Sequence, residues 1–261
     1  MTTSDELAPI DFILQHSAFT LDELQDAYRR MGRKPKLAAH ALDYHVKEGR
    51  ILRIRRGLYV HAKDFVDPWL IASKLAESVV ISHDGALSFH KLTGLGHQLS
   101  YLTTERTSQT TFNEVIYRPI RVTHLPSSKV TEEHSREGMR LTVTRVATTL
   151  VDCCAMLERA PPPLELFEVF KEAINKVKPA DLISYALSLG NRLAVSRLAF
   201  FLTCARYSLA IEENHTLTRH GVKVPTYFHR KQRTDRDTII PRWNLIVSEP
   251  LQSLWFRSIA G

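Results

Sequence analysis

Apolar residues recur every three to four positions near the start of the chain, which is the spacing of one helix face. Residues 9–15 form a first predicted helix with Ile10, Ile13 and Leu14 on one face. Thr20, followed three residues later by Glu23, is a capping-box signature, so a second helix begins there and ends before the turn at residues 32–35. The chain therefore opens with two short helices in quick succession.

A third amphipathic pattern follows this turn and predicts a helix over residues 35–47, because Pro35 suits a first helical turn and Gly49 follows the last one. Its predicted apolar stripe consists of Leu37, Ala38, Ala41, Leu42 and Val46. The opposite face carries Lys36, His40, Asp43, Tyr44 and Lys47.

Residues 51–60 hold two short runs rich in β-forming residues, joined at Arg56-Gly57, and this pattern predicts a hairpin. Three helices followed by a basic hairpin are typical of a winged helix-turn-helix. In that arrangement the third helix enters the major groove of DNA. The arginines of the hairpin can then reach phosphates or the minor groove.

The remainder of the chain predicts a second, larger domain, and we place the domains at residues 1–66 and 67–261. A helix that begins at Pro68 opens this domain. Its first half then contains short predicted strands, over residues 79–81, 99–104, 114–117, 120–123 and 139–143. We predict a loop over residues 126–138. Its second half is helical over residues 146–157, 164–177, 179–189 and 193–207, with a last strand over 245–247. The predicted fold class is α+β: a winged helix-turn-helix followed by a mixed α+β domain with a small antiparallel sheet and a helical half.

Charge changes the meaning of the N-terminal pattern. Ten of the 35 lysines and arginines lie between residues 29 and 56, and the only acids there are Asp43 and Glu48. This window sums to +8, whereas the whole chain is +7, so the other residues sum to about −1. A positive face focused on one small module indicates a nucleic-acid binder. The predicted DNA contacts are Lys36, His40, Tyr44 and Lys47 on the third helix, Arg33 and Lys34 before it, and Arg53, Arg55 and Arg56 on the hairpin.

No motif of catalysis or metal binding accompanies this module. The chain has no Walker loop, GxSxG, HExxH or GxGxxG. His83 and His90 lack partners at metal-ligand spacing and are read as surface or capping residues. Cys153 and Cys154 are read as small buried apolar residues. The sequence predicts no catalytic site, no metal and no cofactor.

Two further features bear on partners and location. A second basic cluster, His229 to Arg236, could contact DNA, RNA or an acidic protein face, or could be a solvated loop. No run of apolar residues is long enough to span a membrane, and the polar start is unlike a secretory signal. The cysteine pattern, which has no CxxC, favours a reducing cytoplasm.

Residues 49–60 (GRILRIRRGLYV) resemble the N-terminal domain of AbiEi-family antitoxins, from type IV toxin–antitoxin and phage abortive-infection systems. Thr148 stands where the family pattern has an arginine, and Asp84-Gly85 is a second departure. Further segments resemble the family in its order: residues 80–88, 143–152, 186–191, 197–202 and 242–247. The resemblance spans roughly residues 10 to 247.

This resemblance implies an antitoxin whose winged domain represses its own promoter. Helix-turn-helix proteins bind DNA as monomers or as homodimers, and both states stay open here. The resemblance also implies a C-terminal domain that counteracts, by contact or functionally, a nucleotidyltransferase-like toxin encoded beside it. Two alternatives remain: a nucleic-acid-processing enzyme with a winged targeting domain, and a scaffold whose winged module binds protein.

Overall fold

The computed structural model describes residues 9–62, 66–173, 175–229, 234 and 236–259. By its internal contacts the chain divides into two compact units. The first consists of Met1–Ile81, Tyr101–Pro126 and Glu133–Val143, and the second of Ser82–Ser100, Ser127–Glu132 and Thr144–Gly261. Residue 66 lies inside the first unit, so these units do not follow the predicted domain boundary. The boundary after residue 66 stays a prediction.

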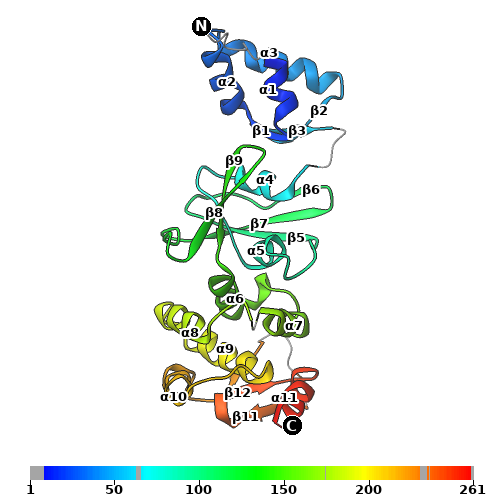
Figure 1. Ribbon diagram of the computed structural model, residues 1–261. Helices are drawn as coiled ribbons and strands as arrows, with labels where there is room; N and C mark the ends of the chain where they lie inside the picture. The colour runs from blue at the N-terminus through cyan, green and yellow to red at the C-terminus, as the bar shows by residue number, and fades with distance from the viewer. Residues whose placement is uncertain (1–8, 63–65, 174, 230–233, 235, 260–261) are drawn as a thin grey trace. The chain divides into compact units, whose positions relative to one another are not determined.

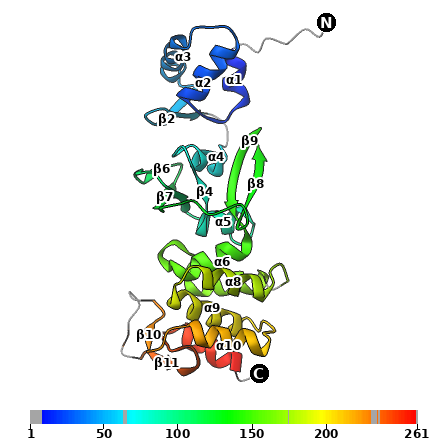
Figure 2. The same ribbon diagram turned by 90° about the vertical axis from the view of Figure 1, so that its left-hand side faces the viewer.

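The first unit begins with three helices and a three-stranded sheet, visible in blue in Figures 1 and 2. The helices α1, α2 and α3 pack with a sheet in the strand order β1-β3-β2, which is the arrangement of a winged helix-turn-helix. Thr20 caps α2 as predicted: its hydroxyl accepts from the backbone N–H of Glu23, and the carboxylate of Glu23 accepts from that of Thr20. The elements are α1 (Pro9–Gln15), β1 (Ala18–Thr20), α2 (Leu21–Arg30), α3 (Lys36–Lys47), β2 (Ile51–Arg55) and β3 (Leu58–His61).

A six-stranded mixed sheet makes up most of the rest of the first unit, although residues 98–100, 131–132 and 144 of its strands belong to the second unit. Its order is β6-β7-β5-β4-β9-β8; β4 pairs antiparallel with β5 and parallel with β9, so the sheet is larger than the small antiparallel one predicted. The elements are α4 (Pro68–Ser73), β4 (Val80–Ile81), β5 (Gln98–Thr103), β6 (Thr110–Phe112), β7 (Val115–Arg121), β8 (Thr131–Arg136) and β9 (Met139–Thr144).

Two strand predictions in this sheet were wrong. The loop predicted over residues 126–138 contains β8, whose sequence Thr-Glu-Glu-His-Ser-Arg is almost wholly polar because β8 is an edge strand with only one neighbour. The two strands predicted over 114–117 and 120–123 are the single strand β7, which continues through Pro119.

The second unit is mainly helical around α9, in which ten residues are buried. Arg197 of α9 is itself buried, and its guanidinium donates to the carbonyls of Cys154 and Phe228, each at 2.8 Å. The α-helices of this unit are α5 (His83–Phe89), α6 (Val146–Ala155), α7 (Pro163–Ala173), α8 (Pro179–Ser188), α9 (Arg192–Cys204), α10 (Ile211–His220) and α11 (Leu251–Ile259). Its short elements are the 3-10 turns Leu157–Arg159 and Pro241–Trp243 and the strands β10 (Thr226–Tyr227), β11 (Thr238–Ile240) and β12 (Leu245–Val247).

The α+β class is therefore confirmed, with helices and sheets in both units. The predicted final strand exists as β12, which lies between β10 and β11 in a second small sheet. The helices α10 and α11 were not predicted. In α10 only Leu217 is buried, so its sequence carries little apolar periodicity.

Candidate nucleic-acid interface

The inner face of α3 holds the helix in the N-terminal core. Ala38, Leu42 and His45 are buried, and they belong to or border the apolar cluster that includes Leu24 and Tyr28 of α2. Leu37, which we predicted in the apolar stripe, is instead 49% exposed. The buried arc is centred on Ala38, Leu42 and His45, and Leu37 lies about 100° further around the helix from Ala38.

The outer face of α3 presents the side chains that we predicted there. Lys36, His40, Asp43, Tyr44 and Lys47 are all exposed. Lys36, His40 and Lys47 form no ion pair and no side-chain hydrogen bond among the described residues. The two ammonium groups and the imidazole are therefore open to a ligand from solution.

The turn that precedes α3 adds two cations to this face. Gly32 has a φ of +68°, a left-handed conformation that glycine adopts without strain, and it redirects the chain from α2 into α3. Arg33 and Lys34 follow it and are exposed. By contrast, Arg29 on α2 is paired with Asp26, and Arg50 after α3 lies 3.8 Å from Glu48. Among the described residues, four exposed cations without an ion pair thus lie at the N-terminal end and on the outer face of α3: Arg33, Lys34, Lys36 and Lys47.

The predicted hairpin exists as β2 and β3, turned at Gly57 with a φ of +81°. Its register shifts between Arg53 and Arg55. The side chain of Arg53 is exposed, with its Nε 3.4 Å from the carbonyl of Arg55, and Arg56 is also exposed. These two arginines are accessible to a ligand.

Arg55 is placed differently from its neighbours. Its guanidinium donates to the hydroxyl of Thr107, at 3.1 Å, and to the backbone carbonyl of Leu75. The Thr107 hydroxyl lies 3.4 Å from the same carbonyl. Arg55 therefore anchors the hairpin to the segment after α4 and to the loop after β5. The sequence could not reveal this, because both partners are far away along the chain.

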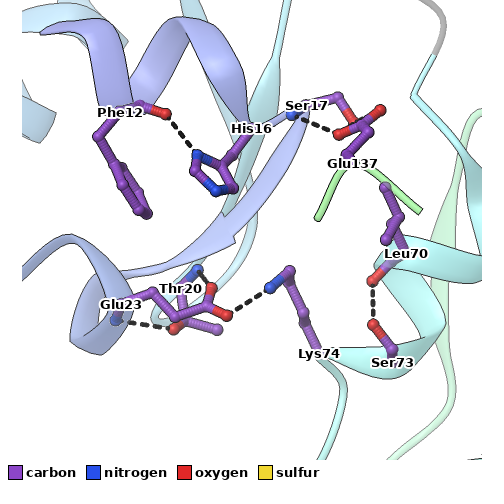
Figure 3. Close-up of polar contacts among 9 residues, drawn as sticks. All are labelled: Phe12, His16, Ser17, Thr20, Glu23, Leu70, Ser73, Lys74 and Glu137. Carbon is purple, nitrogen blue, oxygen red and sulfur yellow. Dashed lines mark hydrogen bonds and ion pairs between the residues drawn. The ribbon is translucent and has the colours of Figure 1, made fainter. Parts of the chain in front are cut away.

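Figure 3 shows two further contacts that hold the winged module within the first unit. The Glu23 carboxylate accepts from the Lys74 ammonium at 2.5 Å, and the side chain of Lys74 is only 6% exposed. The Ser17 hydroxyl donates to the carboxylate of Glu137, which also accepts from the Ser17 backbone N–H at 3.0 Å. The module is thus tied to the rest of the unit on its hairpin side.

A polar cavity of about 540 Å³ lies beside these contacts. Its lining includes four cations and four acids, so it presents no net charge to an anion. They are Arg55, Arg56, Lys74 and Arg140 against Asp22, Glu23, Glu77 and Glu105. The positive face of the module is therefore the α3 side.

Several groups with shifted pKa values belong to the second unit. Burial, and then the charge of Arg159, lowers the pKa of His83 to about 3. This histidine is therefore neutral and buried, whereas we expected a surface or capping residue. Burial raises the pKa of Asp152 to about 7, although the Tyr185 hydroxyl donates to it at 3.0 Å. Cys153 and Cys154 are buried, as predicted, and burial raises the pKa of both thiols.

Three further observations concern metal ions, membrane helices and the second basic cluster. Within the described ranges, no group of three or more histidines, cysteines or acids could hold a metal ion. No described helix is long and apolar enough to cross a membrane. Of the basic cluster from His229 to Arg236, residues 230–233 and 235 lie outside the described residues, and Arg236 is exposed.

Comparison with known proteins supports the resemblance found in the sequence. Residues 9–61 match the family described as "Transcriptional regulator, AbiEi antitoxin". The predicted resemblance is confirmed for this segment, which we call the AbiEi-type domain, and the family is one of regulators. The domain holds all nine residues that we predicted to contact DNA.

The fold of the whole chain also has a known counterpart. The crystal structure of the RV2827C protein from Mycobacterium tuberculosis superposes with a TM-score of 0.62 and 14% sequence identity. The match covers 94% of this chain and 90% of that one. The matched fold therefore includes both the AbiEi-type domain and the region after it. Among curated protein sequences, none matches this chain.

Proposed function

We propose that the protein is a DNA-binding autorepressor and the antitoxin of a type IV toxin–antitoxin system, acting in the cytoplasm without catalytic activity of its own. The observation that carries the DNA-binding part is the outer face of α3. Lys36, His40 and Lys47 are exposed on one side of a helix that occupies the recognition position of a winged helix-turn-helix. The family match, with its description as an antitoxin and regulator, supports the rest.

In this proposal α3 lies in the major groove, and the cations around it contact phosphates. Arg33, Lys34 and Arg53 flank the helix and would hold the phosphate backbone, which positions a protein on DNA without reading its sequence. Arg56 would add a contact at the tip of the hairpin. We assign Arg55 to positioning the hairpin, because its guanidinium already has two partners within the protein.

The antitoxin part of the proposal concerns a nucleotidyltransferase-like toxin, counteracted by direct contact or functionally. The region after the AbiEi-type domain would serve this role, since the predicted DNA contacts all lie within residues 9–61. An enzyme with a winged targeting domain and a winged protein scaffold remain the competing functions.

The test is a titration of DNA from upstream of the protein's own gene, followed by fluorescence anisotropy across a salt series, with random DNA of equal length as comparison. If about six phosphates are neutralised, log K should fall against log salt with a slope near −5. Lys36→Ala/Lys47→Ala should weaken binding and flatten the slope by about 2, since each lysine contributes about 0.9. Equal, weak and salt-insensitive binding to both DNAs would reject the repressor.

The matched control is Lys171→Ala/Arg219→Ala, which removes two exposed helical cations from the second unit and should leave DNA binding unchanged. The same variants then test the antitoxin part by co-expression with the neighbouring gene. Growth rescue that persists in Lys36→Ala/Lys47→Ala would separate neutralisation from repression. Absence of rescue by the wild-type protein would reject the antitoxin role and leave DNA binding to stand alone.

A further inference from the structure

The exposed face of α3 is divided lengthwise into two different edges. Leu37 and Tyr44 lie seven residues apart, about two helical turns, and so follow one line along the helix. They are 49% and 53% exposed. Lys36 and Lys47 follow a second line on the same face, and His40 lies between the two lines. One edge is therefore apolar, and the other carries the two lysines together with the exposed acid Asp43.

The apolar edge does not serve the core of the domain. Leu37 is absent from the buried cluster that Ala38 and Leu42 join. The Tyr44 ring is held at the surface: the Arg50 guanidinium lies 5.7 Å from its centre, and the His45 ring meets it edge-on at 5.3 Å. Two apolar side chains are thus aligned on the face that also carries unpaired lysines.

The charges around this edge indicate which kind of partner fits it. Lys36 and Lys47 flank the edge along α3, and Arg33 and Lys34 precede it. A polyanion that carries apolar groups inside a groove would contact both the lysines and the apolar edge. In the major groove of DNA the apolar group is the 5-methyl of thymine, which distinguishes this base from the other three. Residues near the N-terminus of a recognition helix contact base edges, and Leu37 is the second residue of α3.

We propose that Leu37, supported by Tyr44, reads thymine methyl groups in the major groove and so selects A·T pairs in the operator. This inference rests on the proposed function. It assigns sequence selectivity to a leucine that the amino-acid pattern had placed in the core, and it leaves affinity to the cations.

The experiment uses the upstream DNA in two forms, one normal and one made with deoxyuridine in place of thymidine. Uracil keeps the base-pairing groups and lacks only the methyl. The wild-type protein should bind the uracil form about four-fold more weakly for each methyl that it buries. Leu37→Ala should bind the thymine form more weakly and show a smaller thymine-to-uracil ratio. Its salt slope should equal that of the wild type, because no charge changes.

The variant should fold normally, since Leu37 is half-exposed and alanine favours helix. Leu37→Met should restore most of the thymine preference. Leu14→Ala is the matched control, because Leu14 is 66% exposed on α1 of the same domain; it should retain the full wild-type ratio.

The outcomes separate the inference from the function on which it rests. Specific wild-type binding with equal affinity for both DNA forms would overturn the inference and leave the repressor intact. A uracil penalty of equal size in the wild type and in Leu37→Ala would also overturn it, because the penalty would then report DNA shape. If Leu37→Ala impairs toxin neutralisation while its thymine-to-uracil ratio is unchanged, the edge binds protein and the inference fails. Loss of all specific binding by the wild type would reject the repressor itself.

Discussion

The outer face of α3 and the β2–β3 hairpin are adjacent in sequence and similarly rich in cations, yet the hairpin, unlike the outer face of α3, uses one of its cations to hold the fold. On α3, Lys36 and Lys47 are exposed without ion pairs among the described residues. On the hairpin, Arg55 donates to Leu75 and Thr107, and the hairpin side of the module is tied down by Glu23 and Lys74. The number of cations in a stretch of sequence therefore includes both cations that face solvent and cations that hold the fold.

The strongest test of this difference is Glu23→Gln. Glutamine can still accept the Thr20 N–H bond of the capping box, but it removes the charge opposite Lys74, whose side chain is 6% exposed. A nearly buried ammonium left without its counter-charge should destabilise the protein by about 2–3 kcal/mol, less than a fully buried pair because Glu23 is partly solvated. Chemical denaturation measures this change.

Asp22→Asn is the matched control for Glu23→Gln, because Asp22 is an exposed acid on the same turn of α2. It should change stability by less than about 0.5 kcal/mol. The salt slope of DNA binding should be the same in both variants. If Glu23→Gln is as stable as Asp22→Asn, the hairpin side of the module is not fixed by this ion pair.

A smaller effect is expected from the paired variants Arg55→Ala and Arg53→Ala. Arg55→Ala removes charged donors from the Leu75 carbonyl and should cost about 1.5–2 kcal/mol of stability. It should leave the salt slope nearly unchanged. Arg53→Ala should show the opposite pattern, with wild-type stability and a slope lower by about 0.9.

Thermal unfolding and DNA titration on the same two variants decide this comparison. If Arg55→Ala lowers the salt slope as Arg53→Ala does, while stability stays at the wild-type value, Arg55 is a phosphate contact and the hairpin resembles α3 after all.

The same contrast explains how far the sequence could be interpreted. Helical periodicity and the capping box predicted α2 and α3, and the alternation of charged and apolar residues predicted the outer face of α3. Periodicity did not locate Leu37, because residues at the border of a stripe shift from buried to exposed with a small rotation of the helix. The partners of Arg55 could not be predicted for another reason. A hydrogen bond to a backbone carbonyl, such as that of Leu75, depends on no particular side chain and so leaves no pattern in the sequence. The polar edge strand β8 has few buried residues and so lacks alternation, and for this reason the sequence predicts a loop there.

The smallest predicted effect concerns the inner face of α3, where His45 contrasts with the exposed His40. His45 is buried, and its Nδ1 has no hydrogen-bond partner in the described part of the chain. Burial lowers its pKa below the ordinary value of 6.5, and the charge of Arg50 lowers it further, whereas Glu48 opposes the shift.

As pH falls through 6.5, the unfolded chain binds a proton at His45 that the folded domain does not bind, so the free energy of unfolding should fall with pH. His45→Gln should reduce this loss in thermal unfolding, and the part that buried His83 contributes should remain. His40→Gln, on the exposed face of the same helix, is the matched control. If both variants retain it, the acid sensitivity originates outside α3, and the inner face of the helix contributes packing without a titrating group.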